Sequence, residues 1–150
     1  MKKIFALQGK GNSGKTATFY ILGQLMRDSG YTLREGNLLQ KLARSLRRGD
    51  FWQIFEKDGI IIGIVSSGDL YKIVKQQLDS LIQNHHCEII LCTCRSYDKK
   101  RPGTLVAINE VVGYKKEFFP KERETDPLKY DVSNRMYAER LLNALEQHIQ

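Results

Sequence analysis

Gly9 to Thr16 have the sequence GKGNSGKT, which matches the spacing G-x-x-x-x-G-K-[ST]. The spacing has a mechanical reason, because Gly9 and Gly14 allow backbone φ values that a Cβ would forbid. The loop can then turn its N–H groups inward around a phosphate group. Lys15 would reach the outermost phosphates, and the hydroxyl of Thr16 would coordinate a Mg²⁺ that bridges two phosphate oxygens. The pattern therefore predicts a phosphate-binding loop.

The residues on either side of this loop predict a strand before it and a helix after it. Residues 3–7 form a short run that is rich in apolar and β-favouring side chains. Residues 16–27 carry apolar side chains at helical spacing, and Gly30 follows as a stop signal. A phosphate-binding loop needs this context, because it must follow a strand and open a helix. The flanks therefore argue against an accidental glycine-rich turn.

On this motif and its flanks, the chain resembles the P-loop NTPase superfamily, and it is similar to a small single-domain ATPase or kinase-like member. The resemblance covers roughly residues 2–30. It implies a three-layer α/β/α fold with a mostly parallel sheet, binding of a nucleoside triphosphate, and dependence on Mg²⁺ coordinated by Thr16. The expected nucleotide contacts are Gly9, Lys10, Gly11, Asn12, Ser13, Gly14, Lys15, Thr16 and Thr18.

Length and composition indicate one globular domain over residues 1–150. The chain has 41% hydrophobic and 27% charged residues, and it contains no apolar run of the ~18–20 residues that a membrane span needs. The N-terminus carries two lysines but no apolar signal segment, so we expect a cytoplasmic protein without a membrane partner. The net charge of +7 is compatible with a polyanionic partner. Because a nucleoside triphosphate already is one, a nucleic-acid partner is left open.

Residues 51–56 and 60–65 flank Asp58-Gly59, which is a strong hairpin signal. The second run is almost wholly apolar, as in a central strand that is buried on both faces. We therefore expect a sheet of about five strands with one antiparallel strand at about 50–57. A single hairpin before a central strand looks like the GTPase branch of the superfamily.

In the superfamily, the strand beside the loop strand usually ends in an acidic residue that holds the Mg²⁺ shell through water. The strand at 60–65 would take that place here, and it runs into Ser66-Ser67-Gly68-Asp69. Asp69 is the candidate for the metal role, although three residues separate it from the apolar run. Asp69 could instead cap the next helix, predicted over 70–84. Ser66 or Ser67 could also bind a metal-bound water.

The remaining pattern predicts further elements of an α/β fold. Residues 36–48 read as an amphipathic basic helix, 104–112 as another helix, and Ser133 as the cap of a closing helix. Strands are predicted at 87–94 and 117–119. Cys87, Cys92 and Cys94 could form a metal site with the neighbouring histidines, or they could be small apolar residues of a buried strand. Their spacing lacks a second ligand pair, which favours the buried strand.

Arg95 follows the strand at 87–94, at the sheet edge where open α/β folds bind ligands. It is our candidate for a catalytic cation beside Lys15, with residues 99–101 as a basic lid or an exposed loop.

The first hypothesis for the function is an ATP-binding switch with slow Mg²⁺-dependent hydrolysis. GTP is less favoured because the guanine-reading sequence Asn-Lys-x-Asp is absent.

Two further functions and the oligomeric state are left open by the sequence. One function is a small-molecule or nucleotide kinase, in which Glu35, Asp50 or Asp69 would act as the base near an acceptor hydroxyl. The other is a nucleic-acid-associated protein that is regulated by nucleotide and binds phosphates through residues 36–48. Binding of that kind would weaken steeply with added salt.

Overall fold

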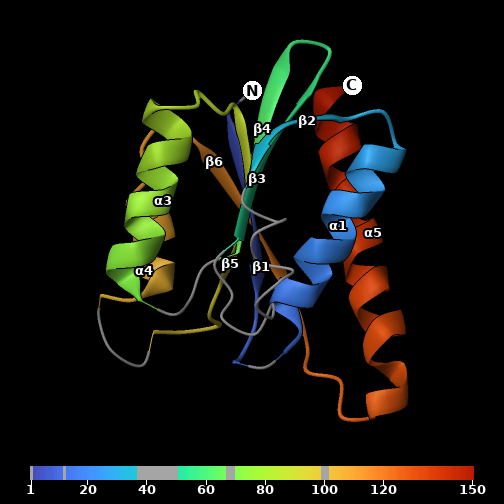
Figure 1. The fold of residues 1–150 in the computed structure, drawn as a ribbon. Helices are drawn as coiled ribbons and strands as arrows, with labels where there is room; N and C mark the ends of the chain where they lie inside the picture. The colour runs from blue at the N-terminus through green and yellow to red at the C-terminus, as the bar shows by residue number, and fades with distance from the viewer. Residues whose placement is uncertain (1, 12, 37–50, 67–69, 99–101) are drawn as a thin grey trace.

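The computed structural model describes residues 2–11, 13–36, 51–66, 70–98 and 102–150, which form a six-stranded sheet with helices on both faces (Figure 1). The strands are β1 (Lys3–Gln8), β2 (Thr32–Gly36), β3 (Phe51–Lys57), β4 (Ile60–Ser66), β5 (Ile89–Cys94) and β6 (Lys115–Pro120). The helices are α1 (Lys15–Asp28), α3 (Tyr71–Gln83), α4 (Thr104–Asn109) and α5 (Tyr130–Ile149), with a short 3-10 helix η2 (Pro127–Lys129) before α5.

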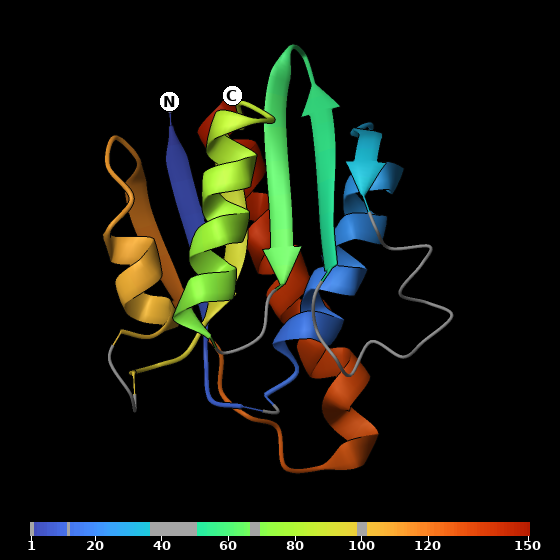
Figure 2. The ribbon, with the colours of Figure 1, turned by 60° about the vertical axis from the view of Figure 1, so that its left-hand side comes forward.

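The strands lie in the order β2-β3-β4-β5-β1-β6. Among the strands of the described residues, only β3 runs antiparallel to its neighbours, as the arrows in Figure 2 show, so the expected α/β class with a mostly parallel sheet is confirmed. The hairpin is also confirmed: Asp58 and Gly59 have φ of +52° and +81°, and a two-residue turn with two positive φ values matches strand twist.

The position of β4 differs from the expectation. β5 lies between β4 and the loop strand β1, so β4 is not the direct neighbour of β1. Both β4 and β5 are almost wholly apolar, and hydrophobic pattern alone does not rank two buried strands within a sheet. The arrangement inferred from a GTPase-like sheet was therefore wrong on this point.

Several element boundaries also differ from the prediction. β2 was not predicted, and it gives the sheet six strands; Gly36, expected to open a basic helix, is its last residue, and the rest of that predicted helix lies outside the described residues. The closing helix begins at Tyr130, so Ser133 lies inside it. The reason is that Asp126 accepts a hydrogen bond from the Leu128 N–H and starts η2, which continues into α5.

Two apolar layers hold the sheet between the helices. Along β1, Phe5 and Leu7 point toward α1 and α5, whereas Ile4 and Ala6 point toward α3 and α4. Burial on both faces explains why the central strands read as continuous apolar runs. None of the helices in the described residues combines the length and the apolar character that crossing a membrane requires.

Candidate phosphate-binding site

The loop between β1 and α1 lies where parallel strands end. Gly9 N donates to the carbonyl of Cys94 at 3.1 Å, so the pairing of β1 with β5 continues into the first loop residue. Gly14 has φ +83° and precedes α1, and Thr18 N donates to the Gly14 carbonyl at 2.9 Å. The loop therefore leads directly into the amino-terminus of α1, where unpaired N–H groups and the helix dipole attract an anion.

Lys15 folds back over the loop. Its Nζ donates to the carbonyl of Gly9 at 2.5 Å and to that of Lys10 at 3.2 Å. Both acceptors are neutral carbonyl oxygens, which phosphate oxygens can replace as stronger charge-assisted partners. The side chain is thus held where an incoming phosphate would meet it.

Thr16 brings the first turn of α1 into contact with the end of β4. The Oγ atoms of Thr16 and Ser66 are 2.8 Å apart, and Ser66 is buried. Hydroxyl oxygens are hard donors that suit Mg²⁺ or its water ligands. Ser66, which the sequence offered with Ser67 as a possible ligand of a metal-bound water, is the last residue of β4 and lies beside Thr16. Asp69 lies outside the described residues.

Arg95 packs against the loop. A Cβ on Gly11 would lie 2.6 Å from Arg95 Nη1, so a larger residue there would require the guanidinium to move. Arg95 N donates to Thr104 Oγ1 at 3.0 Å, and Asp98 accepts hydrogen bonds from the first N–H groups of α4. These bonds hold the segment after β5 against the start of α4. The predicted basic lid at 99–101 lies outside the described residues, as does Asn12.

Thr18 takes part in the junction between the loop and α5. It is fully buried, and its hydroxyl donates to the Gly14 carbonyl at 2.7 Å. Asn134 Oδ1 lies 3.4 Å from that hydroxyl, and it would overlap with a Cβ on Gly14. The side chain of Thr18 therefore contacts the loop at the Gly14 carbonyl and faces α5.

Two residues at the loop were missed by the sequence interpretation. Asn134 lies in the closing helix that the sequence predicts, and neither Asn134 nor Lys121 was given a role at the loop. Lys121 is 4% exposed, and its Nζ donates to the Ser13 carbonyl at 2.5 Å. Burial lowers the pKa of Lys121, and the nearby Glu124 works against that shift. A lysine in a charged segment normally indicates a solvated surface, so no pattern in the sequence pointed to this contact.

Glu35, one of the proposed kinase bases, lies far from the loop. It is on the edge strand β2, four strand spacings or ~19 Å across the sheet from β1. It is also level with Ile4, near the start of β1, and its carboxylate lies 3.6 Å from His85 Nδ1. The register connecting them is Glu35–Ile54, Ile54–Gly63, Gly63–Ile90 and Ile90–Ile4. The sheet order excludes Glu35 from this site; Asp50 lies outside the described residues.

The three cysteines are buried in the layer beneath α3 and α4. Burial raises the pKa of the Cys94 thiol to about 12, although the charge of Lys15 acts in the opposite direction. Neutral thiols of this kind pack as small apolar groups. Within the described ranges, no group of three or more His, Cys, Asp or Glu side chains is arranged to hold a metal ion.

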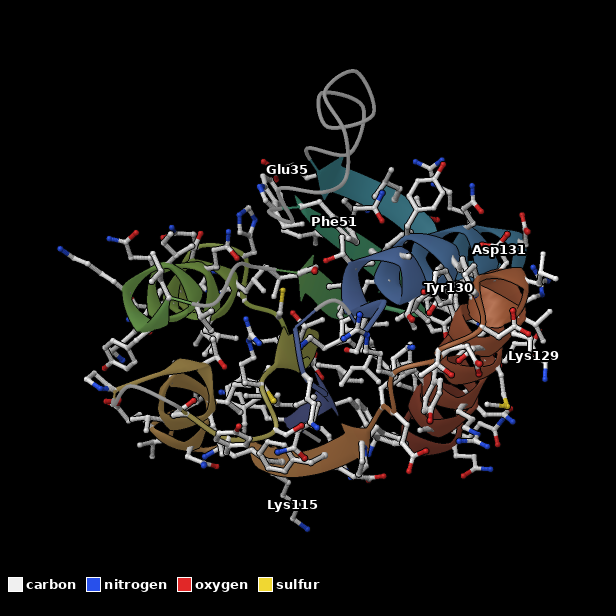
Figure 3. The ribbon with its side chains drawn as sticks, turned by 90° about the horizontal axis from the view of Figure 1, so that it is seen from below. Glu35, Phe51, Lys115, Lys129, Tyr130 and Asp131 are labelled. Atoms are coloured by element: carbon white, nitrogen blue, oxygen red, sulfur yellow. The ribbon has the colours of Figure 1, made fainter. Side chains whose placement is uncertain are left out.

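Comparisons with protein-family models, with curated proteins and with solved structures give no match. The interpretation of the site therefore depends on its own contacts. These contacts join four parts of the chain at one edge of the sheet: the loop, the end of β4, the segment after β5 and the segment after β6 (Figure 3 views this edge from below).

Proposed function

We propose that this chain binds a nucleoside triphosphate with Mg²⁺ in the loop between β1 and α1. The observation that carries the proposal is the position of Lys15, whose ammonium rests on the carbonyls of Gly9 and Lys10 at the amino-terminus of α1. An anion in the loop would meet this cation together with the unpaired N–H groups of the first helical turn. A triphosphate is the anion to which the motif spacing is matched.

Each side chain of the site has a part in this proposal. Lys15 would leave the loop carbonyls and bind the outermost phosphates. Thr16 and Ser66 would hold Mg²⁺, directly or through water, and the bound ion would offset the charge of the phosphate oxygens. Arg95, packed against Gly11, would face charge that develops during phosphoryl transfer. ATP is the preferred nucleotide, since the chain contains no Asn-Lys-x-Asp sequence.

Hydrolysis is expected to be slow. Phosphoryl transfer depends mainly on positioning and electrostatics, which Lys15 and Arg95 could supply. The hydroxyl of Thr16 contacts the hydroxyl of Ser66. We assign no residue to the orientation of the attacking water, which is why slow hydrolysis is expected. Transfer to a small-molecule acceptor is the alternative outcome, and it would appear as conversion of ATP to ADP that requires an added acceptor and releases no free phosphate.

The test is nucleotide-dependent thermal stabilisation, with and without Mg²⁺, for ATP, GTP and non-hydrolysable analogues. At a ligand concentration of 100 Kd, binding adds about 2.7 kcal/mol of stability, which raises Tm by roughly 5–11 °C for a chain of this size. Lys15→Ala should weaken triphosphate binding about 10- to 100-fold, because it removes a charge-assisted hydrogen bond. Lys72→Ala, which removes an exposed lysine of α3, is the matched control.

A wild-type protein that no nucleotide stabilises would refute the proposal. An equal response of wild type and Lys15→Ala would refute the role of the loop. Phosphate release on the same samples separates a hydrolase from a protein that only binds. In the hydrolase, Arg95→Gln should lower release while leaving the Kd for ATP nearly unchanged, because the guanidinium acts on transition-state charge.

A further inference from the structure

Lys121 connects the two ends of the loop to β6. Its backbone N–H donates to the Gln8 carbonyl at 2.6 Å, which extends the pairing of β6 with β1 by one residue. Its side chain reaches the far end of the loop and donates from Nζ to the Ser13 carbonyl. Its own carbonyl oxygen would lie 2.8 Å from a Cβ on Gly9. One residue thus contacts the loop at its first and fifth positions.

The environment of the Lys121 ammonium makes this contact specific. The residue is almost wholly buried, and Nζ lies 4.9 Å from the centroid of the Tyr137 ring of α5. A buried ammonium is costly unless it is paired. Among the described residues, the Ser13 carbonyl accepts its hydrogen bond, the Tyr137 ring lies close to it, and the charge of Glu124 also favours the charged ammonium. Ser13 Oγ is buried as well, and within the described residues it has no hydrogen-bond partner.

The orientation of one peptide group follows from this bond. In a trans peptide, the C=O of one residue and the N–H of the next point in opposite directions. Because the Ser13 carbonyl points at Lys121, the Gly14 N–H points away from it. We propose that Lys121 is a positioning residue, which holds the Ser13–Gly14 peptide so that the Gly14 N–H is aimed at the phosphate that the loop binds. This assignment rests on the nucleotide-binding function proposed above.

Lys121→Met tests the assignment, because methionine keeps an unbranched apolar chain and removes the donor. Lys115→Met is the matched control: Lys115 is the first residue of β6, the strand that ends just before Lys121, and it is exposed and points away from the sheet (Figure 3). The probes are Mg²⁺ with ATP and Mg²⁺ with inorganic tripolyphosphate. Lys121→Met should weaken binding of both probes about 10- to 100-fold and by similar factors, because the lost interaction acts on the phosphates alone.

A second readout follows the peptide itself. In wild type and in Lys115→Met, tripolyphosphate should move the Gly14 amide proton downfield in a ¹H–¹⁵N spectrum, as a charge-assisted hydrogen bond forms. In Lys121→Met this shift should be lost or strongly reduced. If that variant does not fold, Lys121→Gln, which keeps a shorter neutral donor, is measured in its place with the same expectation.

The outcomes separate the two proposals. If wild type binds neither probe, the nucleotide-binding function fails, and the role of Lys121 fails with it. If wild type binds both probes and the Lys121 variant matches it in affinity and in the Gly14 shift, the positioning role alone is overturned. Loss of ATP binding with unchanged tripolyphosphate binding would also overturn it, since the defect would then lie outside the phosphate loop.

Discussion

Replacing Gly14 with alanine should destabilise the protein through two separable effects. The residue has φ +83°, a conformation that disfavours any Cβ. A Cβ there would also overlap with Asn134 Oδ1 of α5. Gly14→Ala therefore strains the backbone and requires either the Asn134 side chain or the first turn of α1 to shift.

The two effects have comparable magnitudes. An alanine in the left-handed region costs about 1–2 kcal/mol. Forcing extra volume against packed atoms typically costs about 1–3 kcal/mol. The sum is about 2–5 kcal/mol, a large part of the ~5–15 kcal/mol that stabilises a typical domain. A loss of about 3 kcal/mol would lower Tm by roughly 6–12 °C in a chain of this length.

Gly30→Ala and Asn134→Ala separate the contributions. Gly30 has φ +88°, and a Cβ added at this position would meet nothing within 4 Å, so Gly30→Ala should show the backbone effect alone. Asn134→Ala in the Gly14→Ala background should remove the collision. The double variant should therefore recover about 1–3 kcal/mol relative to the sum of the single variants.

Urea unfolding of the four variants and the wild type measures these differences, with far-UV circular dichroism as the signal. The reasoning is refuted if Gly14→Ala loses no more stability than Gly30→Ala. It is also refuted if the combination with Asn134→Ala is merely additive, because the contact between α5 and the loop would then carry no energy.

Ser66→Ala should reduce the Mg²⁺-dependent part of nucleotide stabilisation and leave the Mg²⁺-free part unchanged, because it removes the hydroxyl that faces Thr16; equal loss in both conditions would contradict this. The second prediction concerns alkaline pH. Burial raises the pKa of Cys94 from 9.0 to about 12, so between these values the folded state retains a proton that the unfolded state loses. Stability should therefore fall as pH rises through this window, by about 1.4 kcal/mol per pH unit for this thiol. Cys94→Ala should flatten the fall by that amount in urea titrations at pH 9–11, and an unchanged slope would disprove it.

Much of the local structure could be predicted from the sequence because it depends on neighbours along the chain. The apolar runs predicted β1, β4 and β5, and Asp58-Gly59 predicted the hairpin with its positive φ values. β2 was missed because it is a short, mostly exposed edge strand without a run of buried residues. The start of α5 was missed because Ser133 is the cap candidate in the sequence. Asp126 instead accepts a hydrogen bond from the Leu128 N–H and begins the 3-10 turn ahead of the helix.

The sequence by itself determined the loop, its glycines and the chemistry that Lys15 and Thr16 could perform, because these properties depend on residue type and spacing within eight positions. Tertiary structure alone decided what surrounds the loop. In the sheet, β5 lies between β1 and β4, and Glu35 lies far from the loop. Ser66 contacts Thr16, and Arg95 lies against Gly11. The tertiary structure also brought Lys121 under the loop from more than a hundred positions away. Sheet order and packing between distant segments create these contacts, and the hydrophobic periodicity of the sequence does not predict them.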